Sequence, residues 1–500
     1  MVTSEAVPFA KAGGLADAVS ALAETLAVRG HEVSLLLPRY YFIDRDALTP
    51  TGVSIGPLGH TAHLYRTTLP TAGGGRNGAS APEPCVYFLD CETLYGRDGI
   101  YGTREEPVFA DNSRRFAVLS RAAFSLIDAL GLHIDLIHAH DWPSGPVPVY
   151  RDALVENHRF GREHPGATLF TIHNAGYQGI FPRDRDADLG LSPEELDQIG
   201  AYHFDSVSFL KGAIRTADAI STVSETHAQE LQTPEGGFGL DVLYRLRAQD
   251  LFGVLNGMDY NSWNPARDPH LPVRFGQNSI EGKAEAKRAL QAETGLPLDT
   301  GVPLFGMIGR LVEQKGIEEL LRPGYGVLEA MAAELPLQFV VLGTGESWAE
   351  AELRRLCERY PNVSAVLSFD SGLAHRIEAG CDFFLMPSRY EPCGLNQMYS
   401  LSYGTIPIVT ATGGLRDTIR PLERDPENGT GLVMEHCTPW DIHAAVTRAI
   451  HLYREEPAWI RQARLRGMRE RFDWDNAAAT YEQIYAHALD RRRSRLSASV

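Results

Sequence analysis

Short apolar runs bounded by polar, glycine and proline residues recur along the chain, and they predict strands buried on both faces of a sheet. The predicted strands are 31–38, 85–90, 134–140, 167–173, 218–224 and 251–256 in the first half, and 303–310, 337–343, 363–367, 382–387, 406–411 and 430–434 in the second. Stretches with apolar residues at helical spacing lie before, between and after them, and predict helices over 17–29, 113–130, 316–333, 346–359 and 474–492. This alternation predicts parallel sheets with helices on both faces.

The predicted strands are too many for one comfortable open sheet. The irregular segment 256–279 is rich in Pro, Asn and Gly and marks the break between two sheets. We therefore predict two doubly wound domains, residues 1–255 and 256–475, and a C-terminal helix over 476–500 that packs back on the first domain. The segment 71–84, rich in Gly and Ala, is predicted to be a flexible surface loop.

Composition and charge exclude several classes of protein. The chain has 500 residues, 44% of them hydrophobic, and its formal net charge of −17 argues against binding to nucleic acid. It contains no apolar run of about 18 residues, and its first residues do not have the pattern of a signal peptide, so we expect a cytoplasmic protein without a membrane partner. The six cysteines form no CxxC pair and are interpreted as reduced.

Lysine is scarce in this chain, which contains five lysines and 42 arginines. Where arginine supplies nearly all the positive charge, a lysine can mark a site that needs a compact point charge. Lys11 and Lys315 lie beside glycines at predicted strand ends, where ligands of such sheets bind. Lys283 and Lys287 are expected to lie on a solvated face.

Three motifs in the first half follow predicted strand ends or open a helix. In KAGGLAD (11–17), Gly13 and Gly14 allow the backbone to approach a phosphate or sugar, and Lys11 supplies charge. The alternative is a helix entry with an incidental lysine. The other two motifs are HAHDWPSG (138–145) and TIHNAGYQGIFP (171–182).

The second of these motifs offers two functional interpretations. His138 and His140 lie on one face of a strand and suggest a metal site, but no further ligands can be identified, so this interpretation is disfavoured. Asp141, at the strand end, is the better candidate for holding a sugar hydroxyl. In the third motif, His173 and Asn174 lie in a loop at the same end of the predicted sheet, which favours a functional over a purely structural histidine.

In the second half, GRLVEQKG (309–316) places Arg310 and Lys315 after a strand, an arrangement that suits the diphosphate of a nucleotide. The alternative is surface pairing with Glu313 or Glu318. In SRYEPCGLNQMYSLSYG (388–404), Glu391 lies at a strand-to-helix turn, a place that normally attracts anions. Cations, glycine turns, His, Asp and Glu at these strand ends suit an anionic, sugar-like substrate such as a nucleotide sugar.

Taken together, eight segments resemble bacterial glycogen synthases and plant starch synthases in the same order over nearly the whole chain. They are SEAVPFAKAGGLADA, HAHDW, TIHNAGYQGIFP, TPEGGFGLD, NGMDYNSWNP, GRLVEQKG, SRYEPCGLNQMYSLSYGTIPIV and TGGLRDT. The resemblance implies a GT-B fold of two Rossmann-like domains facing across a deep cleft. It also implies transfer of glucose from ADP-glucose to the nonreducing end of an α-1,4-glucan with retention of configuration, without a metal or other cofactor.

The resemblance assigns roles residue by residue. The implied catalytic residues are Glu391, Asp141, His173, Arg310 and Lys315, with Glu391 as the essential carboxylate. The implied donor-binding residues are Lys11, Gly13, Gly14, Arg310, Lys315, Phe369, Gly394, Leu395 and Asn396. The implied sugar- and acceptor-binding residues are Asp17, Asp141, His173, Asn174 and Asn256.

The chain departs from the family pattern at several positions. Ala12 replaces a threonine, and Phe369 replaces the tyrosine that stacks on the adenine. Glu225 and His227 replace a proline and a tyrosine, and Asn396 replaces a threonine or serine. These changes leave the choice between ADP-glucose and UDP-glucose open. The start MVTSE, where relatives have a strand like KILFVSSE, leads us to expect a shortened first strand and a lower stability.

Two other interpretations compete with a glucan synthase. The first is another GT-B enzyme, such as a sucrose or trehalose-phosphate synthase or a phosphorylase. A phosphorylase needs a lysine that carries pyridoxal phosphate, and none of Lys283, Lys287 and Lys315 has a suitable context. The second is a sugar-binding protein that has lost catalysis, which the retained set of charged residues disfavours.

Overall fold

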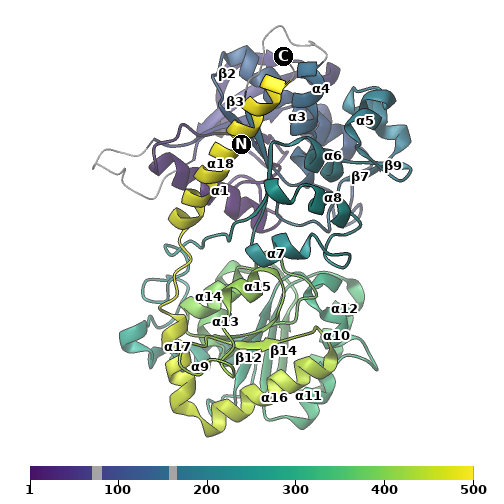
Figure 1. Ribbon diagram of the computed structural model, residues 1–500. Helices are drawn as coiled ribbons and strands as arrows, with labels where there is room; N and C mark the ends of the chain where they lie inside the picture. Colours follow the sequence, from purple (N-terminus) through teal and green to yellow (C-terminus); the bar gives the residue numbers. More distant parts are fainter. Residues whose placement is uncertain (70–81, 157–165, 499–500) are drawn as a thin grey trace. The chain divides into compact units, whose positions relative to one another are not determined.

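The computed structural model describes residues 1–69, 82–156 and 166–498, and its contacts divide the chain into two compact units. Unit 1 comprises Met1–Gly257 and Trp474–Val500, and unit 2 comprises Met258–Asp473 (Figure 1). Most of the surface loop predicted over 71–84 lies outside the described residues.

The main sheet of unit 1 consists of two halves. One half has the order β1-β4-β3-β2, with β1 (Ser34–Pro38) parallel to β4 (Cys85–Asp90), and β2 (Thr49–Ile55) and β3 (Ala62–Thr68) antiparallel beside them. The other half is parallel, in the order β11-β10-β6-β5. Its strands are β5 (Leu136–His140), β6 (Ala167–Ile172), β10 (Ala219–Thr222) and β11 (Leu251–Gly253).

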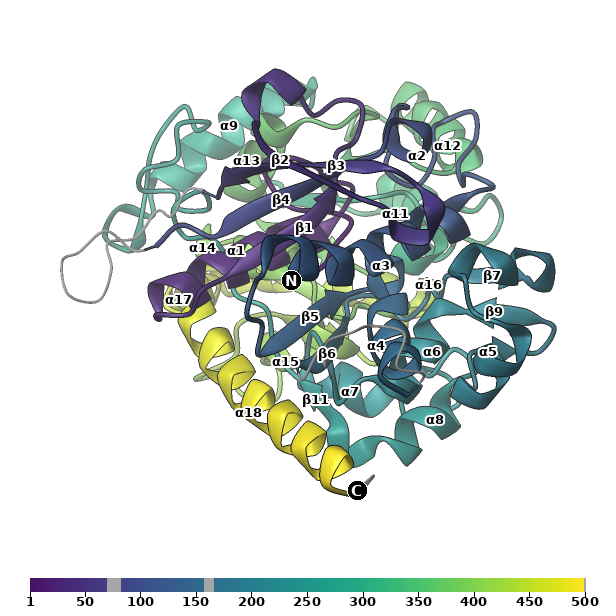
Figure 2. The same cartoon turned by 90° about the horizontal axis from the view of Figure 1, so that it is seen from above.

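Val2 joins the two halves. It forms one parallel bridge to Leu36 on β1 and another to Ala139 on β5. The residues that follow Val2 therefore emerge at the carboxyl edge of the sheet, between these two strands (Figure 2). Ligands of parallel sheets bind at this edge.

Helices cover the main sheet of unit 1, and the unit also contains a separate, small antiparallel sheet. The helices are α1 (Gly14–Val28), α2 (Glu92–Tyr95), α3 (Asn112–Leu130), α4 (Pro146–Glu156), α5 (Pro193–Ile199), α6 (Phe209–Thr216), α7 (Glu225–Glu230), α8 (Asp241–Leu246) and α18 (Trp474–Ala498). The small sheet has β7 (Ile180–Pro182), β9 (Ser206–Ser208) and β8 (Tyr202–His203) in that order. Helix α18 buries Tyr481 and Ile484 in a cluster with Leu22 and Leu26 of α1 and Leu169 of β6 (Figure 1).

Unit 2 is built on a six-stranded parallel sheet with the order β14-β13-β12-β15-β16-β17. Its strands are β12 (Leu304–Ile308), β13 (Gln338–Leu342), β14 (Val363–Val366), β15 (Phe383–Met386), β16 (Ile406–Thr410) and β17 (Leu432–Met434). This is the order of a doubly wound Rossmann-like domain. The direction of winding reverses between β12 and β15, so the carboxyl ends of these two strands border the position where such sheets bind ligands.

Alternate side chains of these strands supply two cores. Phe305, Phe339 and Phe383 face one core, which α10, α11, α12 and α16 cover, whereas Val340 and Phe384 face another, which α9, α13, α14 and α15 cover (Figure 1). The helices of unit 2 are α9 (Gly282–Thr294), α10 (Ile317–Leu321), α11 (Leu328–Glu334), α12 (Ser347–Arg359), α13 (Ser371–Gly380), α14 (Asn396–Ser402), α15 (Gly413–Thr418), α16 (Pro439–Glu455) and α17 (Pro457–Gly467).

Every strand predicted from an apolar run is present, with bounds that differ by a few residues. The prediction of parallel sheets omitted the antiparallel strands β2, β3, β7, β8 and β9. The single helix predicted over 316–333 is wrong, because α10 ends at Leu321 and α11 begins at Leu328. Pro323 and Gly324, whose φ of +75° is left-handed, interrupt it. Within the described ranges, no helix is both long and apolar enough to cross a membrane.

The expectation that Lys283 and Lys287 lie on a solvated face is also wrong, since each is only 3% exposed. Lys283 donates to Thr405 Oγ1 at 2.6 Å and to three backbone carbonyls, those of Glu378, Ala379 and Tyr403. The first two carbonyls belong to the last turn of α13, whose partial negative charge a cation stabilises. Lys283 therefore ties α9 to the C-terminus of α13.

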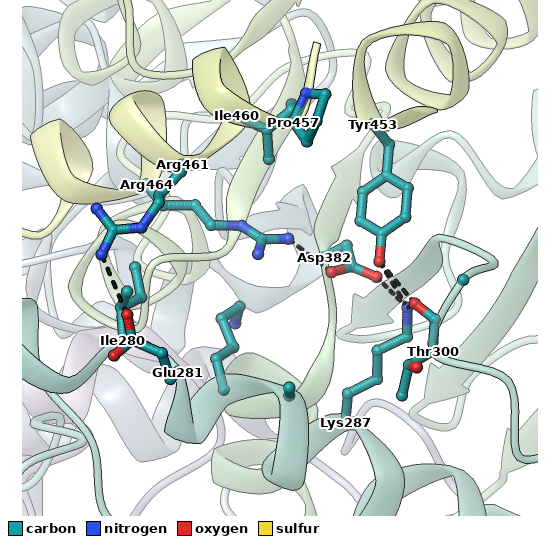
Figure 3. A pocket seen from close by; sticks show the side chains of 13 residues that line it. Ile280, Glu281, Lys287, Thr300, Asp382, Tyr453, Pro457, Ile460, Arg461 and Arg464 are labelled. Carbon is teal, nitrogen blue, oxygen red and sulfur yellow. Dashed lines mark hydrogen bonds and ion pairs between the residues drawn. The ribbon is translucent and has the colours of Figure 1, made fainter. Parts of the chain in front are cut away.

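Lys287 belongs to a network around the buried carboxylate of Asp382 (Figure 3). Asp382 accepts from Lys287 at 2.6 Å, from Arg464 at 2.6 Å and from the backbone N–H of Leu304 at 3.0 Å. Burial alone would raise the pKa of Asp382, but Lys287 and Arg464 outweigh it and hold this pKa below its usual value. The network fixes α9 and α17 to the amino ends of β12 and β15.

We predict that Asp382→Asn lowers the free energy of unfolding by about 3 kcal/mol, because it leaves the buried Lys287 and the partly buried Arg464 without their counter-charge. Urea denaturation at neutral pH measures this loss. The matched control is Glu285→Gln on α9, which removes a pairing with the exposed Arg288 and should leave the midpoint essentially unchanged. Equal midpoints for Asp382→Asn and the wild type would contradict the assignment.

Candidate active site

In unit 2, Glu391 lies in the turn that connects β15 to α14, at the carboxyl edge of the sheet. It is 6% exposed, and its Oε2 atom accepts from Ser388 Oγ at 3.0 Å and forms an ion pair with Lys315. Lys315 follows β12, the neighbouring strand. The reversal of winding between β12 and β15 thus brings together two charges that are distant in the sequence.

Three glycines allow this turn to pack closely. A Cβ at Gly316 would lie 1.9 Å from the carbonyl oxygen of Pro387, and one at Gly413 would lie 2.1 Å from that of Glu391. Both residues also have left-handed φ values, of +72° and +43°. A Cβ at Gly414 would lie 2.1 Å from the carbonyl oxygen of Cys393. The glycine turn that opens α15 therefore supports the turn that carries Glu391.

The backbone after Glu391 presents N–H groups. Gly394 has a left-handed φ of +72°, which turns the chain into α14. Within the part of the chain that the structure describes, the N–H groups of Gly394, Leu395 and Asn396 donate to no protein acceptor. The side-chain amide of Asn396 donates to the carbonyl of Ile308 at 2.8 Å and ties the start of α14 to the end of β12. Positive potential from these groups suits an anion.

The remaining residues predicted for the donor in unit 2 are on its surface. Arg310 follows β12 and is exposed. Phe369 is 88% exposed, immediately before Asp370, whose side chain caps α13 by accepting from the N–H of Leu373 at 2.8 Å. The exposed ring can stack on a planar group.

In unit 1, Asp141 holds two strand ends together. It follows β5 with a left-handed φ of +57°, and its Oδ1 atom accepts from the N–H groups of His173 at 2.7 Å and Asn174 at 3.3 Å, just after β6. Burial raises the pKa of the Asp141 carboxyl to about 7, although these two N–H groups lower it. The structure therefore brings Asp141, His173 and Asn174 into direct contact.

The three histidines form a chain in which His138 and His140 are buried and His173 is partly exposed. His140 Nδ1 lies 3.2 Å from His173 Nε2, and the His138 ring lies 3.9 Å from the His140 ring, centroid to centroid. His138 also bonds Thr171 at 2.6 Å and Tyr485 of α18 at 3.0 Å. Burial lowers the pKa of His173 to about 3, so it is a neutral hydrogen-bonding group at pH 7. Across the described ranges, no group of three or more His, Cys, Asp or Glu residues is arranged to hold a metal ion.

The glycine turn before α1 is anchored by a residue that the sequence patterns did not reveal. The buried Glu5 accepts from the N–H groups of Ala12 at 2.5 Å and Gly13 at 2.9 Å. Lys11 donates to Asp17 at 2.8 Å, and both side chains are partly exposed. Gly14 begins α1, and Asn256 lies buried after β11. The only signal for Glu5 in the sequence is its position shortly before the glycines.

A cavity of about 410 Å³ lies at the opposite, amino edge of the sheet in unit 2 (Figure 3). Lys287, Arg461 and Arg464 contribute positive charge to its lining, whereas burial lowers the pKa of Lys283, which also lines it, to about 7. Lys283 and Lys287 are engaged by the backbone carbonyls and by Asp382 as described above, and Arg461 pairs with Glu281 at 3.1 Å. These cations stabilise the fold, and the carboxyl edge remains the better candidate for chemistry.

Comparisons with known proteins show the family of the chain. The starch synthase catalytic domain family matches residues 1–246, and the glycosyl transferases group 1 family matches residues 291–466. The chain is 44% identical to a glycogen synthase of Treponema denticola over 500 residues, which cover 99% of each chain. It is 46% identical to a glycogen synthase of an Anaeromyxobacter species over 488 residues, which cover 97% of this chain and 98% of that one.

Two solved structures are similar. The catalytic domain of starch synthase IV from Arabidopsis thaliana, bound to ADP and acarbose, has a TM-score of 0.84 and 31% identity, and 98% of each chain is covered. A sucrose-phosphate synthase from Thermosynechococcus elongatus has a TM-score of 0.58 at 19% identity, covering 100% of this chain and 98% of that one, which shows a shared fold alone.

We predict that the Asp141 carboxyl makes stability depend on pH. Its folded pKa of about 7 exceeds the ordinary value of 3.8, so the stability that its proton contributes is present below pH 3.8 and is lost as the pH rises through about 7. Asn is nearly isosteric with Asp and cannot titrate. The urea midpoint of the wild type should therefore fall, relative to that of Asp141→Asn, between pH 4 and pH 8.

Asp135→Asn, at an exposed position before β5, is the matched control and should follow the wild type at every pH. A constant difference between the wild type and Asp141→Asn across this range would contradict the raised pKa.

Proposed function

Because the chain belongs to the glycogen synthase family, we propose that it transfers glucose from ADP-glucose to the nonreducing end of an α-1,4-glucan, with retention of the α configuration. The chain has the GT-B fold, and units 1 and 2 are its two Rossmann-like domains. The ADP bound to the similar Arabidopsis starch synthase supports an adenine nucleotide donor. We propose a cytoplasmic enzyme that needs neither a metal nor another cofactor, with ADP-glucose as substrate.

The observation that carries this proposal is the contact of Lys315 with Glu391, beside backbone N–H groups that donate to no acceptor in the described ranges. Arg310, Lys315 and the N–H groups of Gly394, Leu395 and Asn396 would hold the diphosphate. Glu391 would accept hydroxyl hydrogen bonds from the glucose and stabilise positive charge on its anomeric carbon in the transition state. The turn between β15 and α14 would then contact both groups that the breaking bond joins, the glucose and the diphosphate.

The residues of unit 1 would bind sugars and help to hold the donor. Asp141 and His173, fixed by their mutual contacts, would accept and donate hydrogen bonds to glucose or acceptor hydroxyls, with Asn174 and Asn256 beside the same strand edge. Lys11 would bring positive charge to the donor phosphates at the start of α1, next to Gly13 and Gly14, and its partner Asp17 would accept hydrogen bonds from sugar hydroxyls. In unit 2, Phe369 would stack on the adenine.

The proposed reaction takes place on one face of the sugar. The bond from the anomeric carbon to the β-phosphate oxygen breaks, and the acceptor 4-hydroxyl oxygen forms the new bond to that carbon. The leaving phosphate takes the proton from this hydroxyl, so ADP and a lengthened glucan result. Lys315 and Arg310 stabilise the charge that develops on the phosphate. We assign no covalent nucleophile, because the sequence identifies no second carboxylate opposite Glu391.

Transfer of labelled glucose to glycogen, from ADP-glucose and in parallel from UDP-glucose, tests the proposal. We predict transfer from ADP-glucose, and a loss in Glu391→Gln and Glu391→Ala of at least about 100-fold in kcat, because both remove the charge that the transition state needs. Glu281→Gln, an exposed position at the opposite edge of the sheet, is the matched control and should keep full activity.

A preference for UDP-glucose would overturn the donor assignment and keep the chemistry. If the wild type binds ADP and transfers from neither donor, the chain is a binding protein and the enzymatic proposal is wrong. Full activity in Glu391→Gln would overturn the role of this carboxylate.

A further inference from the structure

Glu5 lies where the chain leaves the centre of the sheet in unit 1 and doubles back toward α1. Ala6 and Ala10 exchange backbone hydrogen bonds of 3.0 and 2.9 Å, and this tight reversal returns the chain over Glu5. Glu5 Oε2 then accepts from the N–H groups of Ala12 and Gly13. The residue is 3% exposed, so its charge is shielded from water and depends on these donors.

The other oxygen of Glu5 is held equally firmly. Tyr101 OH donates to Glu5 Oε1 at 2.6 Å and lies 2.8 Å from Ser4 Oγ. The Tyr101 ring contacts Phe116 and Trp142, the residue after Asp141. The side-chain amide of Asn112 donates to the backbone carbonyl of Tyr101 at 2.8 Å. A rigid aromatic cluster therefore fixes the carboxylate, and the carboxylate fixes the turn.

This arrangement decides which donors the glycine turn can offer to a substrate. Two successive N–H groups in a turn make a site for an anion, and here an internal carboxylate occupies it. Within the described part of the chain, the N–H of Gly14 has no protein acceptor, and a Cβ at Gly13 would meet no atom within 4 Å. The turn thus offers open space, the N–H of Gly14 and the ammonium group of Lys11.

We propose that Glu5 is a positioning residue for the donor nucleotide sugar. Its carboxylate takes the place of a phosphate at Ala12 and Gly13, and so directs the donor phosphates to Lys11 and Gly14. This inference rests on the proposed function, because it assumes that the turn faces a phosphate-bearing donor. Tyr101 acts through Glu5 by holding its second oxygen.

Donor kinetics of Glu5→Ala, Glu5→Gln and Tyr101→Phe test this role. We predict that Glu5→Ala raises KM for ADP-glucose at least about tenfold, because two charge-assisted hydrogen bonds to the turn are lost. KM for glycogen should stay within about twofold of the wild type, since mutational effects confined to one site do not spread to independent ones. Glu5→Gln keeps one acceptor oxygen, so its KM for ADP-glucose should lie between those of the wild type and Glu5→Ala. Glu194→Gln, exposed on α5, is the matched control.

Added formate gives a readout that a purely structural role would not move. A small carboxylate can enter the space left in Glu5→Ala and accept from the same N–H groups, so formate should lower KM for ADP-glucose in this variant and not in the wild type. If formate has no effect and both KM values are unchanged while kcat falls with the folded fraction, Glu5 is only structural. If Glu5→Ala does not fold, an unchanged donor KM in Glu5→Gln and Tyr101→Phe overturns the proposal.

Cleavage at Lys11 by a lysine-specific protease separates this inference from the proposed function. It needs no substrate and reports only whether the turn is anchored. Glu5→Ala should be cut after Lys11 at least about tenfold faster than the wild type, because the open form of the turn becomes more populated. If Glu5→Ala is cut faster but the wild type transfers no glucose, the conclusion that Glu5 anchors the turn stands. Only its role in donor binding is then refuted. Equal cleavage rates would overturn the anchoring itself.

Discussion

The ion pair between Lys315 and Glu391 is the contact on which the candidate site depends. It forms because β12 and β15 are neighbours at the reversal of winding, so the loops after them emerge side by side. Gly316, Gly413 and Gly414 then let backbones approach so closely that any side chain there would overlap a carbonyl. The parallel sheet places the two charges at one edge, and the glycines hold them in contact.

The two units differ in how they hold a carboxylate beside an anion-binding turn. In each, a carboxylate lies beside a turn whose N–H groups attract anions. In unit 1, Glu5 accepts from the turn itself and removes two of its donors. In unit 2, Glu391 is held by Lys315 and Ser388 instead, and the N–H groups that follow it, from Gly394 to Asn396, meet no protein acceptor among the described residues. The second arrangement keeps the turn available for phosphate while a negative charge stays beside it.

The sequence predicted the parts of the fold that burial determines. Continuous apolar runs mark strands that are covered on both faces, so every strand of the sheet in unit 2 was predicted. Strands β2 and β3 were missed because exposed positions interrupt the buried ones along them, so no continuous apolar run marks either strand. The break between α10 and α11 was missed because an apolar helical period continues across Pro323 and Gly324.

For the candidate site, the sequence predicted polar side chains at strand ends, and the structure brings two pairs of them into contact, Lys315 with Glu391 and Asp141 with His173; their roles stay predictions. Prediction failed for charges whose partners are backbone groups. Lys283 was expected in solvent because its acceptors are mostly carbonyls, and Glu5 was overlooked because its partners in the glycine turn are N–H groups. Sequence patterns reveal which side chains are charged, but not which backbone groups the fold leaves for them.

Titration calorimetry of ADP with Lys315→Ala and Glu391→Gln would show whether Lys315 binds the phosphates and Glu391 binds the sugar. Lys315 would serve both the phosphate and the carboxylate, whereas Glu391 would serve the glucose alone. We expect Lys315→Ala to weaken ADP binding at least about tenfold, as for a lost charge-assisted contact, while Glu391→Gln binds ADP as well as the wild type or more tightly. If Glu391→Gln weakens ADP binding as much as Lys315→Ala does, this division of the turn is wrong.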